Sequence, residues 1–369
     1  MINRGRPAQV QTSQRAWGVR NPQFELSLPV FPASLCGSLL QAMALAAGFA
    51  VAAALSESSA LAGQSVNRKL NPGDIIYADS GDAVHGGFII KIDASSGQQT
   101  VLSSGGYLQL PFDPVVDATG EITVSDSGRL IGINPETGTQ SIIADKTRGA
   151  LGLPYGIAFN ESGEILAANL EAIVLVPAGS GQIQVLAQGG SLGSPLGVVE
   201  GSSGELYVLS VGMKKQIIRI NRQTGLQQVV SEGGYFKNPQ ALANHEEAIY
   251  ITDVATPDGN FGVGRVIRVD ARNGAQTIVS EGGYLVGPVG ISIDGAGQLI
   301  VGDPYTVKRK SADLYDGGII RINPVTGHQT LIARGHSDFV NPRGVGIVPI
   351  RATTHKQASS QPVSLDAGH

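Results

Sequence analysis

The sequence predicts an all-β fold built by repetition, a six-bladed β-propeller. The first observation behind this prediction is a phrase at 318–332, Gly-Ile-Ile-Arg-Ile-Asn-Pro-Val-Thr-Gly-His-Gln-Thr-Leu-Ile, which has the pattern of a β-hairpin. Recurrence of one hairpin along a chain indicates a repeat architecture. Close copies stand at 87–102, 128–143, 216–230 and 264–279, and a degenerate copy stands at 171–186.

The second observation is the spacing of the repeated units. Each unit opens at a Pro that begins its first strand, and successive openings lie 43, 41, 44, 49 and 54 residues apart. This is the length of a four-stranded propeller blade. We name the four strands of a unit A to D in chain order. The units open at Pro111, Pro154, Pro195, Pro239, Pro288 and Pro342.

The third observation concerns the two ends of the repeat region. After its opening Pro, the last unit has only a strand A, at 342–350, before a polar tail at 351–369 that we expect to be disordered. The first unit, 74–110, has strands B, C and D but no strand A. We therefore expect 342–350 to pair with the partial blade 74–110. This pairing closes the ring of six blades and covers the sheet edges.

The elements of one unit can be justified in chain order. Strand A is short, as at 156–159, and a Gly-containing turn follows it. Strand B, as at 164–169, is an apolar run that ends on a polar residue. Strand C, as at 217–221, leads through a Thr-Gly or Asn-Gly turn into strand D, as at 276–279. Apolar residues on both faces of these strands suit sheets that pack between neighbouring blades.

Composition supports this fold and excludes some partners. The 50 Gly and 19 Pro suit many short strands joined by tight turns. The net charge of −4 and the lack of a long basic run argue against nucleic acid as a partner. The only Cys, Cys36, precedes the repeats, so we expect a propeller without disulfides. We also expect a monomer.

The first 62 residues have the pattern of a signal peptide with a long basic region. Four Arg precede an apolar run at 39–55, and Ala60-Leu61-Ala62 is a small-x-small cleavage pattern. This interpretation makes 63–73 a linker and predicts export to the periplasm or the extracellular space, with no stable membrane span after cleavage. The alternative is an uncleaved N-terminal anchor.

One face of the predicted propeller carries the connections that differ most between units. The B–C and D–A connections of a propeller emerge together around the channel mouth, and variable loops on a regular scaffold commonly carry function. The B–C loops are long at 254–264 and 304–317. We therefore expect a ligand to contact 79–87, 253–264 and 303–317. His85, Lys308 and Arg309 are candidate ligand contacts there, although the cationic pair has the alternative of a solvated loop tip.

A polar residue ends strand B in every unit, which makes a second candidate site. By register, these residues lie at the same height on the loop-bearing face. A ring of carboxylates can bind a hard cation such as calcium. The alternative is structural, because an Asp at a strand end often accepts backbone N–H bonds. We assign no metal and no cofactor. The ring consists of Asp79, Asp126, Asn169, Ser210, Asp253 and Asp303.

A third pattern lies in the D–A loops. Ser-Glu-Gly-Gly-Tyr ends at Tyr235 and again at Tyr284, and Ser-Ser-Gly-Gly-Tyr ends at Tyr107. These aromatic rings can line a ligand mouth or pack between blades. The repetition favours packing between blades.

The strand patterns carry a resemblance to a known group of proteins. Strand A opens as Pro-x-Gly-Ile/Val, and 120–126 and 297–303 show the run Gly-(Glu/Gln)-(Ile/Leu)-x-Val-x-Asp through strand B. Over about 74–350 the chain resembles the NHL-repeat and gluconolactonase/strictosidine-synthase-like six-bladed propellers. The resemblance implies a divalent metal at the channel mouth in the enzymes, held by Asn or Asp just before the Gly of strand A. This chain has other residues there, and only Asp113, displaced by one, is acidic: Phe112, Tyr155, Leu196, Gln240, Val289 and Arg343.

These observations favour an exported binding or accessory module. We expect a small molecule or a protein to bind at the loop-bearing channel face. The alternative is a metal-dependent hydrolase, lactonase or lyase of the gluconolactonase-like type. It would use some of Asp79, Asp126, Asp253 and Asp303 as ligands of a metal in the channel.

Overall fold

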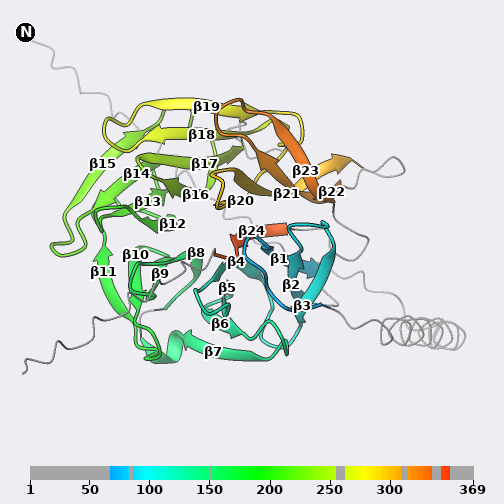
Figure 1. The fold of residues 1–369 in the computed structure, drawn as a ribbon. Coiled ribbons are helices and arrows are strands. Elements are labelled where there is room, and N and C mark those ends of the chain that lie inside the picture. Colours follow the sequence, from blue (N-terminus) through cyan, green and yellow to red (C-terminus); the bar gives the residue numbers. More distant parts are fainter. Residues whose placement is uncertain are drawn as a thin grey trace, which may run out of the picture. The chain divides into compact units, whose positions relative to one another are not determined.

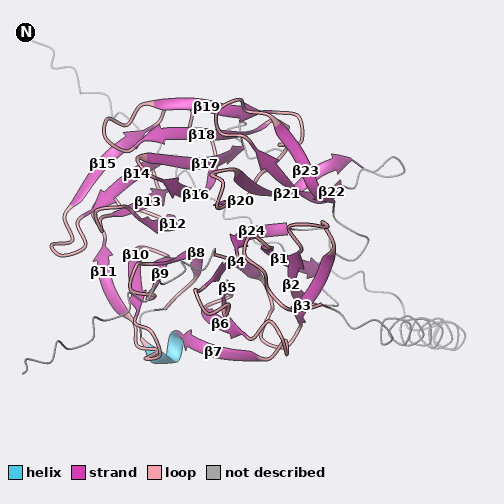
Figure 2. Cartoon of the chain, viewed as in Figure 1, coloured by secondary structure: helices cyan, strands magenta, loops and turns pink. Residues whose placement is uncertain are grey.

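The computed structural model describes residues 67–82, 86–149, 151–254, 262–308, 315–334 and 342–349. Within these residues the secondary structure consists of strands β1 to β24 and one short 3₁₀ helix, Lys146–Arg148 (Figure 2). No helix of the described part is long and apolar enough to cross a membrane. The predicted signal peptide at 1–62 and the tail at 351–369 lie outside the described residues.

The strands form six four-stranded antiparallel sheets, which are the predicted blades (Figure 1). Blade 1 contains β24 (Pro342–Ile347), β1 (Ile75–Asp82), β2 (Gly86–Ile92) and β3 (Gln99–Ser104). Blade 2 contains β4 (Pro111–Val116), β5 (Ile122–Asp126), β6 (Arg129–Ile133) and β7 (Gln140–Asp145). Blade 3 contains β8 (Pro154–Phe159), β9 (Ile165–Asn169), β10 (Ala172–Val176) and β11 (Gln184–Gln188).

The three remaining blades follow the same order from strand A to strand D. Blade 4 contains β12 (Pro195–Glu200), β13 (Leu206–Ser210), β14 (Gln216–Ile220) and β15 (Gln227–Glu232). Blade 5 contains β16 (Pro239–His245), β17 (Ala248–Val254), β18 (Gly264–Asp270) and β19 (Gln276–Glu281). Blade 6 contains β20 (Gly290–Ile293), β21 (Leu299–Lys308), β22 (Tyr315–Ile322) and β23 (Gln329–Arg334).

The ring closes between the two ends of the repeat region, as predicted. β24 is the strand A of blade 1 and pairs antiparallel with β1, with Tyr77 opposite Val345 and Asp79 opposite Pro342. The six inner strands contact one another in order around the ring, and β20 of blade 6 contacts β24 of blade 1. The closing blade therefore has the same four strands as the others, contributed by both ends of the chain.

The glycines of the Pro-x-Gly pattern explain how closely the inner strands approach. A Cβ added at Gly156 would lie 2.8 Å from the Cα of Gly197, and one added at Gly290 would lie 2.3 Å from the carbonyl oxygen of Arg343. Real Cβ atoms do not tolerate such distances, so these positions require Gly. The pattern that identified strand A thus reports the packing of neighbouring strands around the channel.

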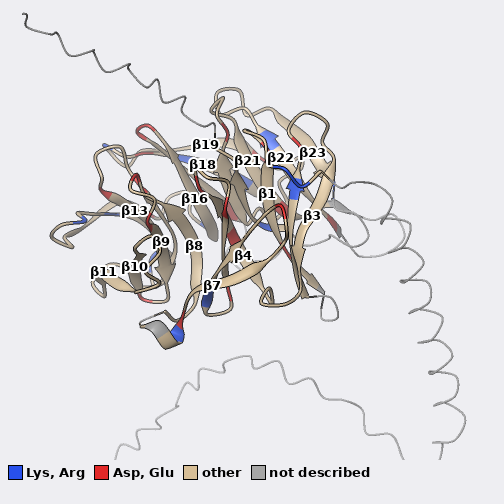
Figure 3. Cartoon of the chain, turned by 60° about the horizontal axis from the view of Figure 1, so that its bottom comes forward, with Lys and Arg blue, Asp and Glu red and all other residues tan. Residues whose placement is uncertain are grey.

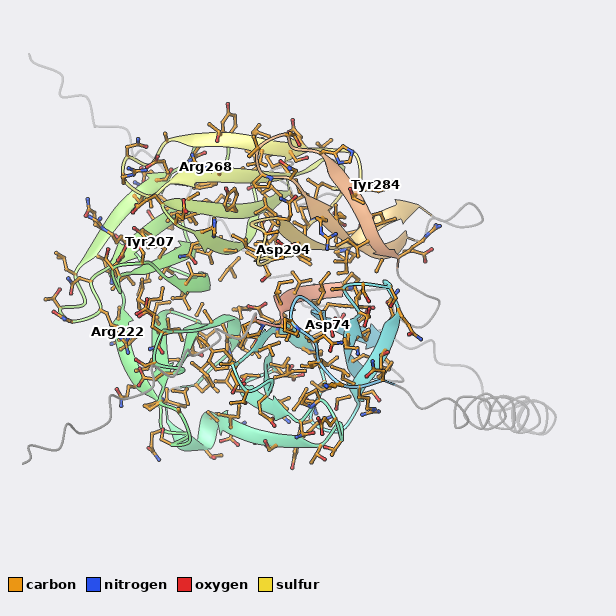
Figure 4. All side chains as sticks on the ribbon, in the orientation of Figure 1. Asp74, Tyr207, Arg222, Arg268, Tyr284 and Asp294 are labelled. Carbon is orange, nitrogen blue, oxygen red and sulfur yellow. The ribbon has the colours of Figure 1, made fainter. Side chains whose placement is uncertain are left out.

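The hydrophobic core lies between the blades, since the strands bury side chains on both faces. One cluster joins Tyr250 and Val266 of blade 5 to Val301 and Ile320 of blade 6. Similar clusters join other neighbouring blades, as the side chains between the sheets in Figure 4 show. Burial of this kind is the main stabilising contribution in a fold without disulfides.

The outer edge of the propeller is held by a repeated set of hydrogen bonds. The Oε1 of Gln276, at the start of β19, accepts from the backbone N–H of Tyr235 at 2.8 Å. Its Nε2 donates to the Oγ of Ser231 at 2.9 Å and to the carbonyl of Gly233 at 3.2 Å. We call this set the interblade clasp. Glutamines at the same position make equivalent clasps at Gln140, Gln227 and Gln329.

The clasp explains the Ser-x-Gly-Gly-Tyr phrase. At Gly234 the backbone has φ +59°, and an added Cβ would lie 2.8 Å from the Oε1 of Gln276, so the position needs Gly. The rings of Tyr107, Tyr235 and Tyr284 remain 43%, 43% and 40% exposed. Figure 4 places Tyr284 beside the outer strand β23. The prediction that these rings pack between blades is therefore wrong, because the backbone N–H of Tyr and not its ring joins the blades.

Residues 67–73, which the sequence assigned to a linker, contact the propeller. The ammonium group of Lys91 is fully buried and donates to the carbonyls of Asn67 at 2.6 Å and Lys69 at 2.9 Å. The guanidinium of Arg68 donates to the carbonyl of Leu102 at 2.9 Å. The chain that leads into β1 is thus bound across the closing blade.

Candidate functional site

A cavity of about 230 Å³ opens at the start of the six inner strands. The inner strands begin directly after the D–A connections, so this cavity lies at the channel mouth on the loop-bearing face. Each blade contributes the residue after its opening Pro. These six wall residues are Phe112, Tyr155, Leu196, Gln240, Val289 and Arg343.

The register of the blades places these six side chains at one height. Pro111 pairs with Asp126, Pro195 with Ser210, and Pro239 with Asp253, so the opening Pro of these blades is opposite the predicted polar residue of strand B. The residue after the Pro then has an equivalent position in every blade. Its identity differs in all six, in contrast to the repeated residues around it.

Arg343 is the only cation in the wall of the cavity. Its side chain is partly buried, and its Nε lies 3.5 Å from the Oγ of Ser80 at the end of β1. No carboxylate of the described residues lies within ion-pair distance of Arg343. The pKa of Tyr305, which follows Asp303 in β21, is raised by burial, and the charge of Arg343 opposes that rise. The charge of the guanidinium therefore acts on the Tyr305 hydroxyl.

Asp113 occupies the position where the other inner strands have Gly or Ala. Its Oδ2 accepts the backbone N–H of Ile157 in β8 at 3.0 Å, which links blade 2 to blade 3. A Cβ added at Gly344 would lie 2.5 Å from its Oδ1, so the carboxyl also abuts blade 1. Burial raises the pKa of Asp113 to about 7, and the Ile157 N–H bond opposes this shift.

Asp113 also lines a second cavity, of about 280 Å³, that lies farther along the same strands. Residues of β4, β8, β16, β20 and β24 contribute to both cavities, so both belong to the central channel. The carboxyl of Asp113 thus stands between the mouth and the deeper part of the channel.

The rest of the mouth is aromatic and apolar on one side. The rings of Phe112 and Tyr155 lie 5.3 Å apart between centroids, at an angle of 60°. Leu196 and Val289 continue the wall, and the Nε2 of Gln240 donates to the carbonyl of Asn238 at 3.0 Å. The mouth combines one cation, one carboxyl, one amide and an apolar surface, a combination typical of small-molecule sites.

The predicted ring of polar residues occupies equivalent positions of strand B, but in blades 1, 5 and 6 the strand continues past the ring residue. Each ring residue is buried, and those of blades 2 to 6 bind the D–A loop that leads into their own blade. The Oδ2 of Asp253 accepts the backbone N–H groups of Lys237 at 2.8 Å and Asn238 at 3.0 Å. Asp126 holds Gln109 and Leu110 in the same way, and Asn169 accepts from Gly152 at 2.7 Å.

The remaining members of the ring also bind backbone groups. Asp303 accepts from Val286 at 2.7 Å, Gly287 at 2.9 Å and Tyr305 at 2.8 Å. The Oδ1 of Asp79 accepts from Gly81 at 2.8 Å, and the hydroxyl of Ser210 donates to the Leu192 carbonyl. Burial raises the pKa of Asp253 and of Asp303 to about 6. This geometry is that of the structural alternative, and no member of the ring lines the channel cavities.

Part of the predicted site falls outside the described residues. His85 and Arg309 are not described, nor are 255–261 of the predicted 253–264 contact. Lys308 is the last residue of β21 and pairs with Tyr315, but its side chain is not described. The role of these three residues in ligand binding stays a prediction.

The described residues contain no cluster of side chains that could bind a metal ion. No group of three or more His, Cys, Asp or Glu side chains in the described ranges is placed to hold a metal ion. Acidic and basic residues are interspersed over the blades (Figure 3). The calcium expectation therefore has no donor set among these residues and stays a prediction.

Sequence reasoning did not assign Arg343, Gln240 or Tyr305 to a site. The first two stood among the positions where the chain departs from the gluconolactonase pattern. The available signal was their register: six different side chains at one position of an otherwise regular repeat. Tyr305 lies in a longer segment, 303–317, that was predicted to contact a ligand.

No protein-family model and no curated protein sequence matches the chain. Solved structures do match its fold. A chain of a nidogen/laminin complex aligns with a TM-score of 0.56 and 15% identity, covering 74% of this chain and 98% of that one. TolB from Acinetobacter baumannii aligns with a TM-score of 0.57 and 16% identity, covering 75% of this chain and 67% of that one. At these identities the likeness shows the fold alone, so the chain is a six-bladed β-propeller and the NHL and gluconolactonase resemblance is not confirmed.

Proposed function

We propose that this protein is an exported binding module that receives its ligand at the mouth of the central channel. The observation that carries this proposal is the cavity of about 230 Å³ at the start of the inner strands. Its six wall positions are equivalent in the fold and different in chemistry. A purely structural ring does not need six different side chains, whereas a binding site needs different side chains to recognise a ligand.

Two further points support a binding role on this face. One chain of similar fold comes from a nidogen/laminin complex, so that chain was solved in an assembly with a protein partner. In this chain, the segments predicted to contact a ligand begin at Asp79, Asp253 and Asp303, next to the mouth. Export is supported by the signal-peptide pattern at 1–62 and stays part of the proposal.

The metal-dependent hydrolase alternative finds little support in the described residues. Asp113 is the only acidic residue in the wall of the mouth, and the strand B carboxylates are engaged by backbone N–H groups. A rise in melting temperature with calcium, or a fall with EDTA, would favour that alternative. We expect neither reagent to change the melting temperature.

Binding at the cavity can be tested with small ligands and with a variant whose larger side chain fills the cavity. We expect a set of small organic fragments, acidic and neutral, to include binders that shift the backbone amide resonances of the inner strands in ¹H–¹⁵N spectra. Val289→Trp places a large ring in the wall and should remove those shifts. The matched control is Val325→Trp, because Val325 is 91% exposed on a turn of the opposite face.

The result is decided by where the shifts occur. Shifts that appear at the inner strands, persist in Val325→Trp and vanish in a folded Val289→Trp variant support the channel mouth. Shifts that survive Val289→Trp, or that cluster at the outer strands, would place the binding site elsewhere. Circular dichroism and thermal melts of both variants check that the fold is intact.

A further inference from the structure

We propose that the channel mouth recognises a carboxylate ligand that carries a single negative charge and a compact apolar body, with Arg343 as the group that holds the carboxylate. This inference rests on the proposed function, since it names the chemical class of the ligand at the same cavity. The geometry that points to it is a partly buried guanidinium in a mostly uncharged wall.

The first step of the argument is the state of Arg343. A charged group withdrawn from water needs a partner, and buried or half-buried guanidinium groups usually pair with a carboxylate or phosphate. Among the described residues its Nε contacts the Ser80 hydroxyl, at 3.5 Å, which is a weak contact. No carboxylate of the described chain pairs with it. The guanidinium of Arg343 lines the cavity and can therefore donate two parallel hydrogen bonds to a ligand.

The second step of the argument concerns the charge of the ligand, which we infer to be a single negative charge and not two. Arg343 is the only cation in the cavity wall, and Asp113 stands deeper in the same wall. A phosphate monoester brings nearly two charges, of which Arg343 can compensate one while Asp113 adds repulsion. A carboxylate matches the planar guanidinium with two parallel hydrogen bonds and brings one charge.

The third step concerns the body of the ligand. Phe112 and Tyr155 form an aromatic wall, and Leu196 and Val289 add apolar surface. The amide of Gln240 lies in the same ring of side chains. Ligand cavities commonly measure about 300 to 1,000 Å³ for drug-sized molecules, so a cavity of about 230 Å³ suits a smaller one. A single aryl or branched alkyl group fits this surface.

Such a carboxylate has two sources, a free small acid or the C-terminus of a peptide that ends in an apolar residue. Both present the same group to Arg343. The experiment therefore uses benzoate with its neutral counterpart benzamide, and the tripeptide Gly-Gly-Phe with its C-terminal amide. Inorganic phosphate serves as the dianion probe.

Binding is measured by titration followed in ¹H–¹⁵N spectra of the full chain. We expect benzoate or the free tripeptide to bind at least about tenfold more tightly than the matched amide, as the loss of a charge-assisted hydrogen-bond pair implies. Arg343→Gln should remove that preference, and Arg343→Lys should keep part of it. Arg272→Gln is the control, because Arg272 is an exposed Arg outside the mouth.

Each outcome decides the inference. Preference of benzoate or of the free tripeptide over its amide, lost in Arg343→Gln, supports it and identifies the source. Equal shifts by acid and amide at the inner strands overturn the carboxylate inference and leave the proposed function standing. Phosphate binding as tightly as benzoate overturns the single-charge class. If acids shift only residues away from the inner strands, both the inference and the proposed function fail. A preference unchanged in Arg343→Gln overturns the role of Arg343.

Discussion

The outer edge of this propeller and its channel mouth are made from the same repeat, yet they use it in opposite ways. At the edge, one Gln in each of four blades makes the same clasp with the preceding D–A loop. At the mouth, the residue after the opening Pro has six identities in six blades. The outer position repeats its chemistry, whereas the inner position varies it.

Recurring and varying positions of the repeat have different roles. A residue needed by every interface recurs, so recurrence in all or most copies indicates a structural role. The strand B carboxylates follow this rule, since they recur and each binds backbone groups of a loop. A position that is equivalent in the fold but free to vary is available to a ligand, as the six wall residues of the mouth are.

The largest expected effect concerns a buried carboxylate that binds three backbone groups. Replacing Asp303 with Ala leaves the N–H groups of Val286, Gly287 and Tyr305 without their acceptor in a buried site. We expect a loss of roughly 3 to 5 kcal/mol in the free energy of unfolding. Urea denaturation followed by circular dichroism measures it.

The conservative variant separates the structural role from a ligand role. Asp303→Asn keeps an oxygen acceptor, and Asn169 shows that Asn serves at this position in blade 3. We expect Asp303→Asn to retain most of the stability that Asp303→Ala loses. If both variants fold as the wild type does and lose binding of a channel ligand, the strand B carboxylates form a binding site after all.

A smaller effect is expected at the outer edge, where the interface between blades 2 and 3 lacks the clasp among the described residues. Gln276→Ala removes three hydrogen bonds between blades 4 and 5, and we expect it to cost about 1 to 2 kcal/mol. In the degenerate copy Ile183 stands at the equivalent place, and the next residue, Gln184, is exposed and makes no such contact among the described residues. Gln184→Ala should stay within about 0.5 kcal/mol of the wild type.

This pair of variants is measured in the same denaturation assay. Equal costs for Gln276→Ala and Gln184→Ala would mean that the clasp contributes little and that apolar burial alone holds the blades. At the interface between blades 2 and 3, Gly149 and Ile183 lie close instead, with an added Cβ at Gly149 only 3.3 Å from Ile183. The degenerate copy in the sequence thus coincides with a different kind of interface.

Much of the fold was readable from the sequence because each signal is local or repeated. Turn glycines, opening prolines and apolar runs set the four strands of a blade, and the half-units at 74–110 and 342–350 predicted the closure that Tyr77 and Val345 make. The clasp was not predicted, since the pairing of a Gln with a loop about 40 residues earlier is a contact between blades.

The candidate site was much less predictable, for a physical reason. The mouth is assembled from one residue per blade, and no sequence window contains two of them. Asp113 and Arg343 are distant in sequence but lie in neighbouring inner strands, β4 and β24. Only the register of all six blades brings them together. The strand B carboxylates recur in the repeat, which indicates a structural role, and their role in ligand binding stays a prediction.

The smallest expected effect concerns the titration of Asp113 at the channel mouth. Burial raises the pKa of Asp113 to about 7, so its carboxyl is mostly neutral at pH 6 and mostly charged at pH 8. The other charged or titratable side chains of the cavity wall are Arg343 from β24 and Tyr155 from β8. As Asp113 ionises it repels a ligand carboxylate, and we expect the affinity for benzoate to fall about threefold to tenfold from pH 6 to pH 8.

The sign of this dependence follows from linkage, and it has a matched control. A bound anion favours the protonated form of Asp113, so binding must raise the pKa of Asp113 and must be tightest below it. Asp113→Asn keeps an acceptor for the Ile157 N–H and removes the titration, so its affinity should not change with pH. Titrations of benzoate at pH 6, 7 and 8 measure both proteins. An affinity that rises with pH, or a slope that persists in Asp113→Asn, would separate Asp113 from the ligand and leave it as a residue that fills the gap between two inner strands.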